Sequence, residues 1–132
     1  MRRVRKCYLY VLTDGIYNKI GISVHPEVRA ASLMTTPSIK ITLLNTYEFR
    51  SESIAKQVEH LFHEYFKQYN VPCPGSKEWF LLNGYQFEEI DRLAKAAQTV
   101  CEKYPANAIE HLYSIFGLSV LPASNNRKLE VG

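Results

Sequence analysis

Residues 8–21, YLYVLTDGIYNKIG, limit the fold more than any other stretch of the chain. Tyr8–Leu12 is aromatic and apolar, Asp14-Gly15 is a strong turn signal, and apolar residues resume over Ile16–Ile22. Two such runs around an Asp-Gly pair predict a tight β-hairpin with a two-residue turn. Gly21 falls inside the second strand, where glycine marks a bend or a close approach of another group.

The composition indicates one folded domain in a reducing compartment. The chain has 132 residues, 46% of them hydrophobic and 12% aromatic, which suits a single domain with a substantial core. The cysteines, Cys7, Cys73 and Cys101, are odd in number and widely spaced, which argues against a disulfide framework and a structural zinc site. Because no apolar run reaches the length of a signal peptide or a membrane span, we expect a cytoplasmic protein without membrane contact.

Local signals predict the remaining elements. After the hairpin we expect a short helix from Pro26, a strand at 39–49, a long helix from Ser51, and a helical pair at 87–101 and 105–116. Ser23 is a candidate cap for the first helix, and Ser51 for the second, which we expect to be the longest. The continuous apolar run Ile41–Leu44 suggests that the third strand is buried on both faces.

An ordered set of motifs resembles the GIY-YIG nuclease superfamily, and more narrowly its phage- and prophage-rich T5orf172 branch. The set extends from about Tyr8 to Leu82. It consists of Tyr8-Leu9-Tyr10, Lys19-Ile20-Gly21, Arg29, Thr36-Pro37-Ser38-Ile39-Lys40-Ile41, Glu59-x-x-Phe62-His63-x-x-Phe66 and Lys77-Glu78-Trp79-Phe80.

The resemblance implies a role for each matching residue. Tyr10 matches the tyrosine of the family's first motif, and Lys19 stands where many members have a second tyrosine. Arg29 matches the helix arginine. Glu59 matches the single metal-binding carboxylate, which implies Mg²⁺ or Mn²⁺ as the cofactor. We further hypothesise that the Lys19 ammonium lies close to the Tyr10 phenol and favours its phenolate.

Other residues complete the predicted site. Tyr8 shares a face with Tyr10 by strand parity, and His63 lies one helical turn from Glu59, so both are secondary candidates for substrate contact or proton transfer. The predicted DNA contacts are Arg2, Arg3, Arg5, Lys6 and Ser23. The literal Gly15-Ile16-Tyr17 is interpreted as a decoy in the hairpin turn, and the family's late asparagine has no clear counterpart, although Asn83 is nearby.

The expected fold is a small α/β (α+β) domain: a three-stranded antiparallel sheet flanked by helices, with a C-terminal helical extension. We expect the nuclease-like domain at 1–84, its extension at 85–121 and a flexible tail at 122–132. The expected function is metal-dependent cleavage of DNA, as a phage-associated endonuclease or nickase. A homodimer is expected through the apolar residues of the C-terminal helices, namely Leu112, Ile115, Phe116 and Leu118.

Two alternatives stay open. A catalytically inactive DNA- or protein-binding module would have the same fold and basic residues, and a net charge of +3 does not by itself indicate a nucleic-acid partner. Taken one at a time, the site residues also have structural explanations, because strand tyrosines, a helix-surface arginine and a boundary glutamate are ordinary features of small domains.

Overall fold

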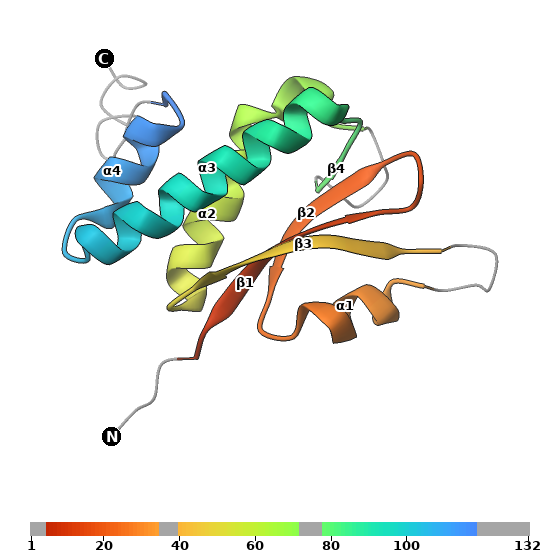
Figure 1. Cartoon of the computed structure of the whole chain (residues 1–132), viewed down its shortest axis with the longest axis horizontal. Helices are drawn as coiled ribbons and strands as arrows, with labels where there is room; N and C mark the ends of the chain where they lie inside the picture. Colours follow the sequence, from red (N-terminus) through yellow and green to blue (C-terminus); the bar gives the residue numbers. More distant parts are fainter. Residues whose placement is uncertain (1–4, 35–39, 72–77, 119–132) are drawn as a thin grey trace, which may run out of the picture.

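The structure is a computed structural model that describes residues 5–34, 40–71 and 78–118. A small antiparallel sheet separates one helix from three others (Figure 1). The elements are β1 (Cys7–Thr13), β2 (Asn18–Ser23), α1 (Pro26–Ser32), β3 (Thr42–Phe49), α2 (Glu52–Tyr65), the 3₁₀ turn η1 (Lys67–Tyr69), β4 (Trp79–Phe80), α3 (Gly84–Lys103) and α4 (Ala108–Ile115). The predicted α+β class is confirmed.

The hairpin forms as predicted, but its loop is longer than the two residues that we expected. Strands β1 and β2 pair antiparallel from Tyr8 opposite Ser23 to Thr13 opposite Asn18. The loop therefore spans 14–17, closed by a 3.1 Å hydrogen bond from the Asp14 amide to the Tyr17 carbonyl. The residue after Asp14 has a φ of +104°, a conformation that favours glycine, which explains why Gly15 stands there.

The sheet contains a further strand, and its order is β3-β1-β2-β4. The short strand β4 pairs with β2, with Asn18 opposite Phe80 and Lys19 opposite Trp79. This fourth strand was not predicted, since the expected sheet had three strands. Strands β1 and β2 are the central strands of the sheet. Strand β4 pairs with the first two residues of β2, so the last residues of β2, near Ser23, lie beyond this pairing.

The prediction that β3 is buried on both faces is wrong. Strand β3 lies at the edge of the sheet, and Leu44 is 47% exposed. The pairing with β1 shifts between Val11, opposite Asn45, and Leu12, opposite Leu43, so Leu44 is left as a bulge. Bulges of this kind are common on edge strands, where they discourage pairing with other chains.

Each face of the sheet has its own core. On one face α2, α3 and α4 cover a large cluster that includes Leu9, Ile20 and Phe62, whereas on the other α1 covers Tyr10 and Leu12 (Figure 1). Helix α3, at 20 residues, is longer than α2, at 14, so the expectation that the second helix would be the longest is wrong. Among the described residues, none of the helices is long and apolar enough to cross a bilayer.

The C-terminal helices belong to the main core. Leu112 and Phe116 are buried in it, and Ile115 and Leu118 pack against it. Leu112 and Phe116 are therefore not available for the dimer interface that we predicted, and Ile115 and Leu118 are only partly exposed. The cysteines behave as small core residues, since Cys7 and Cys101 are free and buried; Cys73 and the predicted tail at 122–132 lie outside the described residues.

Asn83 caps α3, which explains why this helix begins at Gly84, three residues before the predicted start. Its side-chain oxygen accepts hydrogen bonds from the Tyr85 and Gln86 amides, at 2.9 and 3.2 Å. The Asn83 amide in turn donates a hydrogen bond to the side-chain oxygen of Gln86. Such a capping box satisfies amides that the helix itself leaves unpaired.

We expect Asn83→Ala to lower the free energy of unfolding by about 1 kcal/mol, because the cap is lost. Urea denaturation followed by circular dichroism measures this. If Asn83 instead served as a site residue, the substitution would leave stability unchanged and impair function.

Candidate functional site

Tyr10 and Gly21 form the centre of the candidate site. They lie opposite each other on β1 and β2, and Tyr10 is only 1% exposed. The Tyr10 ring occupies the space beside the Gly21 Cα: a Cβ added to Gly21 would lie 2.6 Å from the phenol oxygen. The predicted close approach at Gly21 is therefore confirmed, and it is the side chain of Tyr10 that approaches.

Arg29 reaches Tyr10 from helix α1. The helix begins at Pro26, which occupies its first turn, and Arg29 lies exposed in its last turn. Burial raises the pKa of Tyr10, and a hydrogen bond from the Arg29 guanidinium, together with its charge, opposes that shift. Because the pKa of Tyr10 is raised, the phenol keeps its proton at neutral pH, so the predicted phenolate is wrong.

Lys19 has a different partner from the one that we expected. Its ammonium forms an ion pair with Glu78 and lies 5.8 Å from the centre of the Trp79 ring. Lys19 is 5% exposed. The pairing of β2 with β4 places the residue before Trp79 alongside Lys19. Sequence reasoning missed Glu78 as a site residue, although it belongs to the motif Lys77-Glu78-Trp79-Phe80 on which the resemblance rested.

Glu59 approaches the same cluster from helix α2. Burial, and to a smaller extent the negative charge of Glu78, raise the pKa of this half-buried carboxyl to about 7, against the opposing charges of Lys19 and Lys56. Glu59 and Glu78 also both act on Tyr10, where their charges help to raise its pKa. The structure thus brings Tyr10, Lys19, Arg29 and Glu59 together, as the resemblance implied, and adds Glu78.

The donor set fits a hydrated divalent cation better than zinc. The part of the chain that the structure describes has no group of three or more His, Cys, Asp and Glu side chains able to hold a metal. Mg²⁺ needs only one or two carboxylates because it keeps several waters. Glu59 offers such a carboxylate, and a cation there would offset both its desolvation and the charge of Glu78.

The secondary candidates are engaged in structural contacts. The Nε2 of His63 lies 2.8 Å from the Ile20 carbonyl oxygen, a hydrogen bond that ties α2 to β2, and burial lowers the pKa of His63. The Tyr8 hydroxyl lies 3.5 Å from a carboxylate oxygen of Glu48, on the neighbouring strand. The Ser23 hydroxyl accepts a 3.0 Å hydrogen bond from the His25 amide, so it caps the turn before α1 rather than the helix itself.

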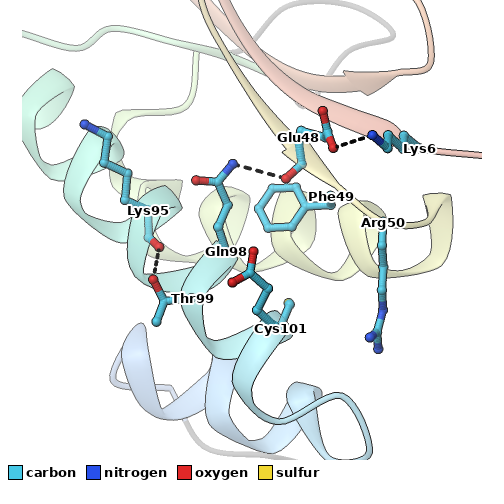
Figure 2. Close-up of a pocket in the computed structure, with 9 residues that line it drawn as sticks. Lys6, Glu48, Phe49, Arg50, Lys95, Gln98, Thr99 and Cys101 are labelled. Carbon is cyan, nitrogen blue, oxygen red and sulfur yellow. Dashed lines mark hydrogen bonds and ion pairs between the residues drawn. The ribbon is translucent and has the colours of Figure 1, made fainter.

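Of the predicted basic contacts, Arg5 is exposed, while Arg2 and Arg3 lie outside the described residues. Lys6 lines a groove of about 840 Å³ between β3 and α3 (Figure 2). The cations there already have partners. Lys6 pairs with Glu48 at 3.1 Å, Lys95 pairs with Asp91 at 3.0 Å, and Arg50 donates to the Pro105 carbonyl at 3.1 Å.

The comparison with protein families matches this chain over residues 7–101, to a family described as the T5orf172 domain. The match begins at the first residue of β1 and ends within α3, so it extends past Leu82, where the sequence resemblance was expected to end. No match was found among curated proteins or among solved structures. Because the family match covers most of the described fold, including every residue of the candidate site, this chain belongs to the T5orf172 domain family, a nuclease-like, GIY-YIG-associated family.

Proposed function

We propose that this protein hydrolyses phosphodiester bonds in DNA with the help of a divalent cation, Mg²⁺ or Mn²⁺. The observation that carries the proposal is the convergence of Tyr10, Arg29 and Glu59, which come from β1, α1 and α2, beside the Lys19–Glu78 ion pair. An arginine, a phenol and a carboxylate in one place supply the anion-binding, positioning and metal-binding groups that phosphodiester hydrolysis needs.

Arg29 and Tyr10 are suited to bind the scissile phosphate. The Arg29 guanidinium is exposed and offers a planar fork of donors, which matches the oxygens of a phosphate. The Tyr10 hydroxyl keeps its proton, since its pKa is raised, and can donate a hydrogen bond to a phosphate or water oxygen. Burial of the Tyr10 ring holds that hydroxyl in place.

Glu59 is the residue that would hold the cation, with Glu78 next to it. A bound Mg²⁺ would polarise a phosphate oxygen and stabilise the charge on the leaving oxygen. Lys19 keeps Glu78 in position through their ion pair. One such site per chain cuts one strand at a time, so we expect nicked products first.

Arg29→Ala is expected to slow cleavage of a labelled DNA duplex by about 10²–10³-fold under single-turnover conditions, since a transition-state donor is lost. The matched control is Arg92→Ala, because Arg92 is an exposed arginine on α3, outside the cluster. That control should cleave like the wild-type protein. Equal rates for the two variants would contradict the role of Arg29.

A DNA-binding module without cleavage is the second candidate. It is favoured by one observation, namely that Lys19, in the place of the family's second tyrosine, has its charge paired with Glu78. Salt-sensitive binding of DNA with no cleavage in Mg²⁺ or Mn²⁺ would decide for this alternative.

A further inference from the structure

The hairpin loop presents two large side chains to solvent from a fixed backbone. Ile16 is 67% exposed and Tyr17 is 38% exposed. A carboxylate oxygen of Asp14 accepts hydrogen bonds from the amides of both residues, at 2.9 and 2.8 Å. The Thr13 hydroxyl donates to the Tyr17 carbonyl at 3.1 Å. Exposed apolar side chains on a loop held this firmly are typical of a recognition element, because little conformational freedom is lost on binding.

Tyr17 forms one wall of a pocket of about 320 Å³. The other lining residues are Gln68, Tyr69, Asn70, Val71 and Leu81. Leu81, although 56% exposed, is held by a 2.9 Å hydrogen bond from its amide to the Tyr69 carbonyl, and the Val71 amide donates to the Trp79 carbonyl at 2.9 Å. Backbone hydrogen bonds therefore fix the wall formed by Tyr69 and Val71 to the wall formed by Leu81.

The lining chemistry selects a flat, aromatic ligand with polar edges. Tyr17 and Tyr69 contribute aromatic rings, Leu81 and Val71 contribute apolar surface, and the exposed amide of Gln68 can both donate and accept hydrogen bonds. Proteins bind the unpaired bases of nucleic acids with this combination of groups. The volume lies at the lower end of the range of about 300–1,000 Å³ that is usual for small-ligand sites.

The pocket lies next to the candidate site. Tyr17 precedes β2 by one residue and Lys19 by two, which is about 7 Å along a strand, or about two stacked nucleotides. Leu81 directly follows β4, whose residues Trp79 and Phe80 pair with Lys19 and Asn18. Gly21, which lies opposite Tyr10, is four residues or about 13 Å from Tyr17, so a DNA strand held at Arg29 and Tyr10 would reach the pocket over about four nucleotides.

We propose that this pocket binds an unpaired base of the DNA substrate, stacked against Tyr17, so that DNA with a bulged or flipped nucleotide near the cleaved bond is the preferred substrate. This inference rests on the proposed function, since it names the substrate class of the same site.

The test compares two labelled duplexes that differ by one bulged nucleotide, bound in EDTA and followed by fluorescence anisotropy. The wild-type protein should bind the bulged duplex about tenfold more tightly or better, the usual effect of stacking one base. Tyr17→Ala should lose this preference, and Tyr17→Phe should keep it. Leu81→Ser, on the opposite wall, should weaken it. Tyr104→Ala, which removes a tyrosine with the same 38% exposure outside the pocket, should have no effect.

Equal binding of the two duplexes by the wild-type protein, or an unchanged preference in Tyr17→Ala, would overturn the inference. Cleavage of fully paired DNA that depends on Arg29 would then leave the proposed function standing, whereas a wild-type protein that binds neither duplex in EDTA and cleaves neither in Mg²⁺ or Mn²⁺ would overturn both. Sedimentation of the same proteins tests another occupant: a dimer that Tyr17→Ala converts to a monomer would assign the pocket to a second copy of the chain.

Discussion

Glu59→Gln is expected to make the metal-free protein more stable at pH 8 while it reduces DNA cleavage by about a thousandfold. The gain arises because the half-buried carboxylate, next to Glu78, is costly to ionise, whereas glutamine has nearly the same shape and no charge. We expect about 1 kcal/mol, after allowance for the solvent that reaches this group. The loss of cleavage reflects a missing metal ligand, and metal ions contribute several kcal/mol to such reactions.

The pH dependence of the stability gain has a definite sign. The pKa of Glu59 rises from 4.5 to about 7 on folding, so the folded protein holds this proton more tightly than the unfolded chain. The stabilisation that the protonated Glu59 carboxyl gives to the folded protein is fully present below pH 4.5, and it is lost as the pH rises through about 7. Glu59→Gln should therefore match the wild-type protein near pH 4 and exceed it at pH 8.

Chemical denaturation in EDTA at both pH values measures this, with Glu64→Gln as the control. Glu64 is an exposed glutamate on the same helix, and its contact with Lys67 is a 3.8 Å surface pair of little energetic value. A stability gain of equal size at both pH values would show that the carboxylate of Glu59 is not the cause. Addition of Mg²⁺ should stabilise the wild-type protein and the control but not Glu59→Gln.

Gly21→Ala is expected to lower the free energy of unfolding by about 1–3 kcal/mol, the usual range for overpacking a well-packed site. The new Cβ would lie 2.6 Å from the Tyr10 phenol oxygen and 2.7 Å from its Cζ atom. The ring has no room to move away, because Tyr10 is packed between Leu12, Ala30 and Ile41 and is 1% exposed. Cleavage should fall as well, since the displaced hydroxyl no longer lies in position beside Arg29.

Gly84→Ala is the matched control for this substitution. A Cβ at Gly84 meets nothing within 4 Å, and Gly84 is the first residue of α3, without a positive φ. Alanine there should leave stability unchanged or raise it by about 0.4–1 kcal/mol, because the unfolded chain loses freedom. Thermal unfolding of both variants checks the pair, and equal melting temperatures would refute the packing of Tyr10 on Gly21.

Local sequence signals were sufficient to predict most individual elements. The Asp-Gly pair located the hairpin, Pro26 located α1 and Ser51 located α2, whose first turn it caps through a 3.2 Å bond from the Ile54 amide. These features depend on a few neighbouring residues, which is why they could be predicted. The loop came out longer than expected because the Asp14 carboxylate binds two amides beyond the glycine.

Strand order and packing partners were beyond the local signals. The apolar run Ile41–Leu44 resembles a buried strand, but the strand order β3-β1-β2-β4 places β3 at the edge of the sheet. Strand order depends on contacts between distant segments, which a local run of residues does not encode. Similarly, the apolar face of α4 showed only that Leu112 and Phe116 needed a partner. Their partner is the core of the same chain, which amphipathic spacing alone does not distinguish from a second subunit.

The candidate site was predicted through the resemblance, and its charge pairing was not. Strand pairing places Gly21 opposite Tyr10 and Lys19 opposite Leu12. Lys19 therefore lies two residues nearer to the hairpin loop than Gly21, the residue that faces Tyr10. The partner of Lys19 depends on the pairing of β2 with β4, which no local signal predicted. Glu78 therefore could not be assigned to the site from the sequence, although it lies within one of the motifs on which the resemblance rests.

Conversion of supercoiled plasmid DNA by the purified protein in Mg²⁺ or Mn²⁺, with Glu59→Gln run beside it, tests the nuclease proposal most directly. The wild-type protein should convert the plasmid to its nicked, open-circular form, and Glu59→Gln should leave it supercoiled while remaining folded by circular dichroism. Equal conversion by both proteins would place the active site elsewhere. A wild-type protein that leaves the plasmid intact in both Mg²⁺ and Mn²⁺ would contradict the proposal that it cleaves DNA.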